Sequence, residues 1–242
     1  MPVRNYHLNS RRVGRWTATF PFHHHTATSE NMPEVQRHGF TFEEWVRKQF
    51  FGGYQAPSYT GHWDVPAERN EKFGNVAVSI KTAKFGSPVG FGDALRQFSI
   101  REDFLLVVGY WKQEGRNKRI VNAIAAPITT HTWASLWSPI TLNDLRELDA
   151  AIKDRTIGYN EARRRAQAIK TASPFASAAI TLNPKIDSKT QRRLQCSIGF
   201  ALMFDRVVPN AIRGEIENQE MLGIRVIEPF LSSARTFLRP RH

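Results

Sequence analysis

The chain has 242 residues, 41% of them hydrophobic and 23% charged, which is typical of a globular protein and excludes a largely disordered chain or a coiled-coil rod. Its 34 lysines and arginines outnumber its 22 acids, so the formal net charge is +12 and polyanions are the expected partners. One cysteine, Cys196, excludes an intrachain disulfide and a cysteine-rich zinc site, and fits a reducing, cytoplasmic compartment. The longest apolar run, residues 104–111, is too short for a membrane helix, so no membrane partner is expected.

The first elements along the chain are an arm and a helix. Residues 1–38 are polar and irregular, and we expect an N-terminal arm there. Its three adjacent histidines, His23–His25, could not all face one ion in a regular element, so a metal site there is the less favoured alternative. Apolar residues at helical spacing predict a helix over 41–50, with Thr41 and Glu44 as its capping box and two glycines at its end.

Short strands dominate the next part of the chain. A β-rich segment predicts a strand over 76–80, and four glycine and proline residues predict a loop over 86–92. Asp93 is placed to cap a short helix. Further strands are predicted over 104–110 and 119–126. The first of these is almost wholly apolar, so we expect it to be buried on both faces.

The second half mixes helices with strands. Two helices are predicted, each opened by an asparagine cap, over 143–153 and 160–170. Three strands are predicted, over 176–182, 194–200 (where a helix reaching residue 204 competes) and 223–227. No repeat or clear linker separates these elements. Their order predicts an α/β (α+β) fold with a central sheet.

One short pattern carries chemistry. Asp64 precedes the first strand, which ends in Ser79-Ile80-Lys81. Residues two apart in a strand point to the same face, so Ser79 and Lys81 would face one site. A carboxylate such as Asp64, helped by the carbonyl of Ile80, would hold Mg²⁺, which neutralises charge on a scissile phosphate and lowers the pKa of a bound water. A nearby lysine orients or deprotonates that water. The pattern therefore predicts phosphodiester cleavage.

These residues resemble the PD-(D/E)XK nuclease superfamily, and most of all its type II restriction endonucleases. The matching pieces, in the family's order, are Gly39-Phe40-Thr41-Phe42-Glu43, Asp64 and Ser79-Ile80-Lys81, followed by a helix and an apolar strand. The resemblance covers residues 38–128 and implies a restriction-endonuclease-like central mixed sheet flanked by helices. It implies one nuclease domain, 39–242, with a catalytic core at 39–128 and a C-terminal elaboration for DNA recognition at 140–242.

The chain departs from the family at Ser79, where an acid is usual, so the resemblance implies a second carboxylate from elsewhere. The candidates are Glu43, Glu44, Glu68 and Asp93. At about 100° per residue, Glu43 borders the apolar face of its helix, whereas Glu44 points nearly opposite. Glu43 is therefore favoured as catalytic support and metal ligand, with Asp93 as the alternative. Lys84 is the nearest rival of Lys81.

DNA contacts are expected in the second half, because residues 151–200 hold ten lysines and arginines against three acids. Such side chains bind phosphates, with arginine reading guanine and asparagine or glutamine reading adenine. The segment 183–193 joins basic and amide groups, and its candidates are Lys185, Lys189, Gln191, Arg192 and Arg193. Arg164, in a run of three arginines, is a candidate phosphate contact. A charged solvent-exposed loop is the alternative interpretation.

The sequence therefore predicts a Mg²⁺-dependent, sequence-specific endonuclease that cleaves double-stranded DNA, similar to type II restriction enzymes. Two alternatives stay open: a structure-specific nuclease of the resolvase or repair type, and a non-catalytic DNA-binding protein with a degenerate nuclease core. No Gly-Lys-Ser/Thr phosphate-binding loop is present, so no nucleotide cofactor is expected. A homodimer would suit a palindromic site.

Overall fold

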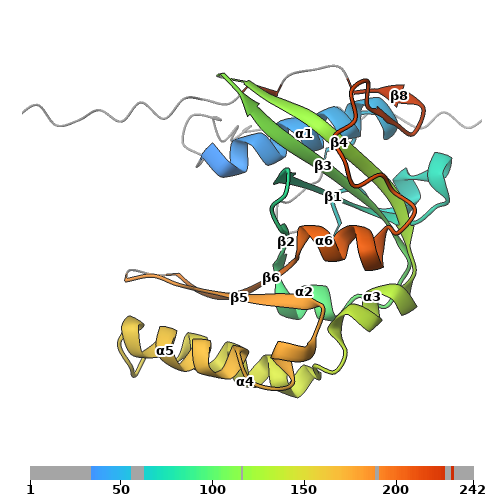
Figure 1. The fold of residues 1–242 in the computed structure, drawn as a ribbon. Coiled ribbons are helices and arrows are strands. Elements are labelled where there is room, and N and C mark those ends of the chain that lie inside the picture. Colours follow the sequence, from blue (N-terminus) through green and yellow to red (C-terminus); the bar gives the residue numbers. More distant parts are fainter. Residues whose placement is uncertain (1–33, 56–62, 116, 189–190, 227–229, 232–242) are drawn as a thin grey trace, which may run out of the picture. The chain divides into compact units, whose positions relative to one another are not determined.

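The computed structural model describes residues 34–55, 63–115, 117–188, 191–226 and 230–231 (Figure 1). Its helices are α1 (Glu34–Phe50), η2 (Ala67–Arg69), η3 (Glu71–Phe73), α2 (Ala94–Phe98), α3 (Thr130–Trp137), α4 (Leu142–Lys153), α5 (Tyr159–Lys170), η4 (Phe175–Ser177), α6 (Phe200–Leu202) and the π-helix η5 (Met203–Val207). Its strands are β1 (Ala77–Lys84), β2 (Val89–Asp93), β3 (Phe104–Glu114), β4 (Asn117–Ile128), β5 (Ile180–Ile186), β6 (Arg192–Ile198), β7 (Glu220–Met221), β8 (Ile224–Arg225) and β9 (Phe230–Leu231).

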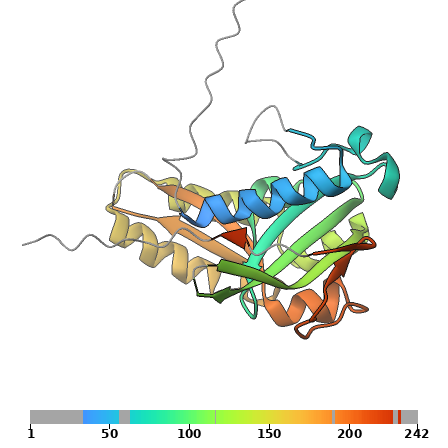
Figure 2. The same ribbon diagram turned by 90° about the horizontal axis from the view of Figure 1, so that it is seen from above.

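Two sheets organise these elements. The larger is mixed, in the order β1-β3-β4-β9, with β1 parallel to β3 and the other pairs antiparallel. The smaller is antiparallel, in the order β2-β6-β5, and β7 pairs with β8 in a separate hairpin. Helix α1 lies over the face of the mixed sheet (Figure 2). The prediction of a mixed α/β fold with a central mixed sheet flanked by helices is confirmed.

Strand β3 is buried on both faces, as its apolar sequence predicts. Leu105 and Val107 join the core beneath α1, together with Phe42. Leu106 and Val108 point the other way, into the larger core that the second half of the chain completes. Because neighbouring strand residues alternate in direction, one apolar run supplies both cores and places α1 on the opposite side of the sheet from α3, α4 and the β5–β6 hairpin.

The approach of α1 to the sheet depends on Gly109 of β3. A Cβ atom at Gly109 would lie 2.7 Å from Cζ of Phe42, closer than van der Waals contact allows. We therefore expect Gly109→Ala to displace the ring and to lower the free energy of unfolding by about 1–3 kcal/mol in denaturant titrations. Gly90→Ala is the matched control, since nothing lies within 4 Å of its added methyl group. Equal stability of the two variants would contradict this packing.

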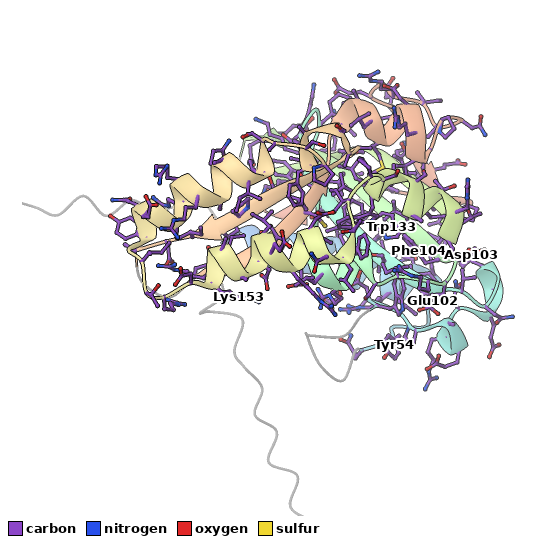
Figure 3. All side chains as sticks on the ribbon, turned by 90° about the horizontal axis from the view of Figure 1, so that it is seen from below. Tyr54, Glu102, Asp103, Phe104, Trp133 and Lys153 are labelled. Carbon is purple, nitrogen blue, oxygen red and sulfur yellow. The ribbon has the colours of Figure 1, made fainter. Side chains whose placement is uncertain are left out.

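An aromatic contact packs α3 against the start of β3. The rings of Trp133 and Phe104 lie 5.3 Å apart, edge to face, and Trp133 Nε1 donates a hydrogen bond to the carbonyl of Gln97 (Figure 3). Asp103, next to Phe104, accepts hydrogen bonds from the backbone and hydroxyl of Thr130 at the start of α3. Together these contacts tie the loop before β3 to the helix that follows β4.

Helix α1 differs from its prediction at one end. It begins at Glu34, so Thr41 and Glu44 lie inside the helix and the predicted capping box is wrong. Apolar periodicity marked the part of the helix that packs on the sheet and missed the turns before it. The predicted arm, residues 1–38, lies outside the described residues except for the start of α1, and His23–His25 lie outside them too. The predicted end is confirmed, because α1 stops at Phe50, before two glycines with positive φ.

The predicted asparagine caps of the two C-terminal helices are also wrong. Thr141 caps α4 in a capping box with Asp144, and Asn143 lies inside the helix. Gly158 precedes α5, and Asn160 lies inside that helix. Threonine and glycine are helix-capping residues as well, and each helix begins one residue before the asparagine, with its cap two residues before it.

Strand boundaries shift wherever a distant partner extends them. Strand β1 continues to Lys84 because it pairs with β3 along its whole length. The predicted loop over 86–92 contains most of β2, which forms because β6 pairs with it from more than 100 residues away. The strand predicted over 176–182 is β5, displaced to Ile180–Ile186. Both interpretations of 194–204 hold in part, since β6 ends at Ile198 and α6 follows at once.

Among the described residues, no helix is both long and apolar enough to cross a bilayer.

Candidate catalytic site on strand β1

Asp64 is held beside β1 by backbone pairing. The neighbouring residue Val65 forms an isolated antiparallel bridge with Val78, and the amide of Asp64 donates to the carbonyl of Val78 at 3.0 Å. Val65 and Val78 are fully buried. This short pairing turns the Asp64 carboxylate toward the next residues of β1.

Asp64, Ile80 and Lys81 form a compact polar cluster. One carboxylate oxygen, Oδ2 of Asp64, accepts hydrogen bonds from the amide of Ile80 at 2.6 Å and from Nζ of Lys81 at 2.9 Å. Lys81 Nζ also donates to the carbonyl of Ile80 at 3.0 Å. The side chains of Lys81 and Asp64 are 21% and 24% exposed, so the ion pair is shielded yet open to a ligand.

Glu43, on α1, adds a second carboxylate to this cluster. Its side chain is 17% exposed and accepts a hydrogen bond from Arg47 at 2.8 Å. Burial raises the pKa of Glu43 from 4.5 to about 7, with repulsion from Asp64 adding to the rise, while Arg47 and Lys81 oppose it. Glu43 is therefore within electrostatic reach of both Asp64 and Lys81.

The other carboxylates considered from the sequence lie in different settings. Glu44 points to solvent and pairs with Lys48 at 3.1 Å, and Glu68 is exposed in η2. Asp93 is the N-cap of α2, with its Oδ1 accepting the amide of Arg96 at 2.9 Å. The structure thus leaves Glu43, the residue favoured by helical angle, largely buried within electrostatic range of Asp64, and gives Asp93 a capping role.

Ser79 and Lys84, which the sequence pattern offered as possible members of this cluster, form no side-chain hydrogen bond or ion pair with its described residues. Ser79 shares a face of β1 with Lys81 but is only 5% exposed, and no hydrogen bond joins its hydroxyl to another described residue. Lys84 is exposed at the end of β1 and, three positions from Lys81, points to the opposite face. Lys81 is therefore the lysine that meets Asp64.

The oxygen atoms of this cluster fit a hydrated Mg²⁺ ion. The ammonium of Lys81 already contacts both the Asp64 carboxylate and the Ile80 carbonyl, so these two oxygens converge on one cationic group. Mg²⁺ is commonly held by one or two carboxylates together with waters. Asp64 and Glu43 could supply the carboxylates, and the Ile80 carbonyl could supply a further oxygen ligand. A site held by protein side chains alone is not expected here, because no group of three or more His, Cys, Asp or Glu side chains suited to a metal occurs among the described residues.

The raised pKa of Glu43 predicts a pH-dependent stability in the absence of metal. The folded chain keeps the Glu43 proton up to about pH 7, whereas the unfolded chain releases it near 4.5. The protonated Glu43 therefore contributes fully to the free energy of unfolding below pH 4.5, and this contribution is lost as the pH rises to 7. The loss is at most about 3 kcal/mol. We expect Glu43→Gln to be more stable than the wild type above pH 7, measured by thermal unfolding across the pH range.

Glu44→Gln is the control for this measurement, because Glu44 is the adjacent, exposed residue of the same helix. Its pH profile of stability should match that of the wild type. If the two variants changed the profile alike, Glu43 would not be buried against Asp64.

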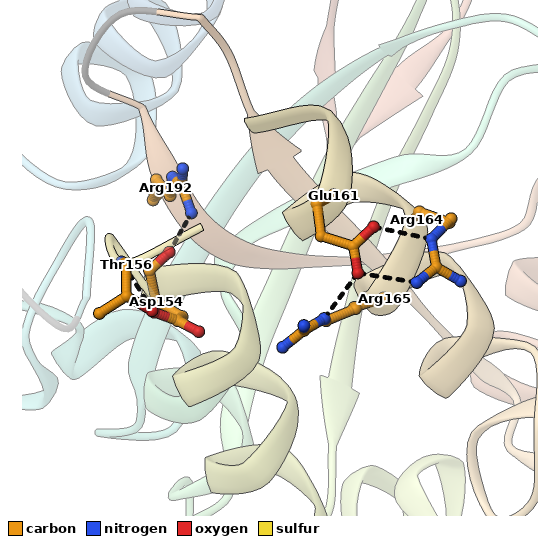
Figure 4. Close-up of polar contacts among 6 residues, drawn as sticks. All are labelled: Asp154, Thr156, Glu161, Arg164, Arg165 and Arg192. Carbon is orange, nitrogen blue, oxygen red and sulfur yellow. Dashed lines mark hydrogen bonds and ion pairs between the residues drawn. The ribbon is translucent and has the colours of Figure 1, made fainter. Parts of the chain in front are cut away.

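The residues expected to contact DNA differ in their surroundings: some are bonded to other parts of the protein and some are exposed. Arg192 donates to the carbonyls of Ile152, Asp154 and Ile157, so its guanidinium closes the end of α4, as Figure 4 shows for Asp154. Arg164 and Arg165 both bind Glu161 of their own helix, and these bonds lower the pKa of Glu161 to about 2 (Figure 4).

Lys185 and Arg193 remain exposed and stand directly opposite each other on β5 and β6. The backbone of Gln191 is bonded to Asp187 at the turn between these strands, and Lys189 lies outside the described residues. Sequence reasoning missed Gln195, whose position two residues beyond Arg193 places it on the same face of β6.

Comparison of this chain with models of protein families, with curated proteins and with solved structures finds no match. Function is therefore inferred from the chemistry and geometry of its residues.

Proposed function

We propose that this chain is a Mg²⁺-dependent endonuclease that cleaves double-stranded DNA at specific sequences, in the manner of type II restriction enzymes of the PD-(D/E)XK superfamily. The observation that carries the proposal is the convergence of Asp64, the Ile80 carbonyl and Lys81 on β1, with Glu43 beside them. The element order supports it as well. A helix, an acid and a strand that carries the lysine come in the order that the resemblance implies, and after β2 a second helix and an apolar strand follow.

Each residue of the cluster has a defined task in phosphodiester hydrolysis. Asp64 and the carbonyl of Ile80 would hold the metal, and Glu43 would supply the acid that is missing at Ser79. Bound Mg²⁺ would neutralise charge on the scissile phosphate and lower the pKa of a coordinated water. Lys81, whose ammonium lies against Asp64 and the Ile80 carbonyl, would orient the attacking water. The near-neutral pKa of Glu43 suits this role, because a cation beside it favours the ionised carboxylate.

A DNA-binding protein without catalysis is the second candidate, and it is favoured by Ser79. With a serine in place of the usual acid, the cluster has two carboxylates, and Lys81 already neutralises one of them. Such a site is stable without metal. The net charge of +12 serves DNA binding equally under both proposals.

Plasmid digestion separates the candidates. Supercoiled plasmid is incubated with the protein and Mg²⁺, and in parallel with EDTA. Discrete fragments that require Mg²⁺ would support the restriction-type endonuclease, whereas a smear would indicate nonspecific cutting. Cutting of branched but not of linear duplexes would indicate a resolvase-type nuclease. A gel shift with no cutting under any condition would support the non-catalytic protein.

A further inference from the structure

The hairpin formed by β5 and β6 has two chemically distinct faces. Alternation along the strands sends apolar residues to one side, among them Leu182, Ile186 and Leu194, all at most 6% exposed. The opposite side carries polar residues only, arranged in cross-strand pairs: Thr181 with Ser197, Asn183 with Gln195, and Lys185 with Arg193. We call these six residues the polar face of the hairpin.

Helices α4 and α5 cover the apolar face, and no helix among the described residues packs on the polar face. Both α4 and α5 run along one side of β5 and β6 (Figure 1). Arg163 and Lys170 of α5 donate to the carbonyls of Ile186 and Leu182, and Arg192 closes the end of α4. Three of the basic residues of this region are thus used to hold the helices on the hairpin.

Two basic groups of the polar face have no partner among the described residues. Lys185 and Arg193 are exposed, and neither is joined by a hydrogen bond or an ion pair to any other residue in the described part of the chain. Like charges placed directly opposite on neighbouring strands repel, so this pair costs stability unless an anion lies against it. The arrangement is therefore complementary to a polyanion.

Amide groups adjoin this basic pair. The Asn183 amide nitrogen is bound to Ser197 Oγ at 2.9 Å, which fixes Asn183 in place. Gln195, its cross-strand neighbour, is half-buried, and its amide makes no hydrogen bond to another described residue. A free amide and a free guanidinium two residues apart on one strand are the side chains that read adenine and guanine.

The polar face also borders the candidate catalytic site. In the smaller sheet, Gln195 stands opposite Asp93 of β2, and β2 directly follows β1, the strand that carries Lys81. Strands β1 and β2 are also in contact with each other. A duplex that reaches Lys81 could therefore also extend along the hairpin.

We propose that the polar face of the hairpin enters the major groove of the DNA substrate, where Arg193 and Gln195 read base edges and Lys185 contacts phosphate. A two-stranded β-ribbon fits the major groove, in which all four base pairs are distinguishable. The proposal rests on the proposed function, since it identifies the surface that would give the nuclease its sequence specificity. Asn183 acts as a positioning residue that holds the amide row in register.

Binding measurements on two kinds of duplex test this proposal. The preferred sequence is found by selecting bound duplexes from a random pool with wild-type protein in Ca²⁺, a larger ion expected to occupy the carboxylates without supporting fast cleavage. Arg193→Ala and Gln195→Ala should each weaken binding to the selected duplex by about 10- to 100-fold, and binding to random duplex by much less. Arg165→Ala and Gln167→Ala, on exposed positions of α5, are the matched controls and should change both affinities less than about threefold.

The outcomes separate this proposal from the proposed function. Plasmid cleavage at discrete sites with unchanged selectivity in both hairpin variants would overturn the hairpin proposal and leave the nuclease intact. Selective binding that both variants lose, without cleavage by the wild type, would support the hairpin and overturn the nuclease. Equal losses on selected and random duplexes would reduce the polar face to a phosphate contact, and tighter binding of single-stranded RNA than of duplex DNA would overturn the choice of partner.

Discussion

Asp64→Asn should abolish DNA cleavage while leaving DNA binding nearly unchanged. The substitution keeps an oxygen that can accept the Ile80 amide, which Asp64 Oδ2 accepts at 2.6 Å, and so preserves the local fold. It removes the negative charge that would hold Mg²⁺. A metal ion held there would contribute several kcal/mol of charge stabilisation in the transition state, which corresponds to a rate loss of about a thousandfold or more. Single-turnover cleavage of a linear duplex at saturating Mg²⁺ measures this loss.

Glu68→Gln is the control for Asp64→Asn. Glu68 is an exposed carboxylate in η2, only a few residues along the chain, and it should be replaceable without a change in rate. Binding to duplex DNA in Ca²⁺ and thermal unfolding of both variants show whether a loss of cleavage reflects chemistry or folding. Cleavage by Asp64→Asn at the wild-type rate would remove this cluster from consideration as the active site.

Lys81→Ala should have the second largest effect, a loss of about 100- to 10,000-fold in cleavage rate, the usual range for removing a group that transfers or orients a proton. Lys81 also neutralises Asp64, and without it only Arg47 opposes the repulsion between the carboxylates of Asp64 and Glu43. We therefore expect Lys81→Ala to be less stable than the wild type without metal, and to regain stability when Mg²⁺ is added. Cleavage rates and melting temperatures, each with and without Mg²⁺, measure both effects.

Lys84→Ala is the matched control for Lys81→Ala, because it removes the same group from the same strand on the opposite face. It should cut at the wild-type rate. If Lys84→Ala were inactive and Lys81→Ala active, the side of β1 that carries the chemistry would be assigned wrongly. If both variants were fully active, no lysine of β1 would take part in catalysis.

Local patterns in the sequence identified much of what surrounds the cluster. The apolar run from Phe104 predicted a strand buried on both faces, which β3 is. Helical angle separated Glu43 from Glu44, and the structure places them accordingly, Glu43 largely buried and Glu44 in solvent. Strand alternation put Ser79 and Lys81 on one face. These features follow from the helical and strand periods, which depend on the backbone alone.

Features that depend on distant partners could not be predicted in this way. Most of β2 was expected to be a loop, since glycine and proline weaken a strand locally, and it exists because β6 pairs with it. The start of α1 was missed because the apolar stripe marks only the turns that pack on the sheet. For α4 and α5, caps two residues earlier in the sequence were equally compatible with the helical pattern.

Arg192 and Arg193 show where local pattern ends and tertiary structure begins. Their chemistry is identical and both were predicted to contact DNA from the sequence. Alternation along β6 establishes that they point to opposite faces, and this much is determined by the sequence itself. Which face would be covered was decided by α4 and α5, which pack against the side that carries Leu194 and leave Arg192 bound to backbone carbonyls and Arg193 exposed. The physical reason is that a side chain's direction is a property of its own strand, whereas its burial depends on apolar surfaces far away in the chain that fold against that strand.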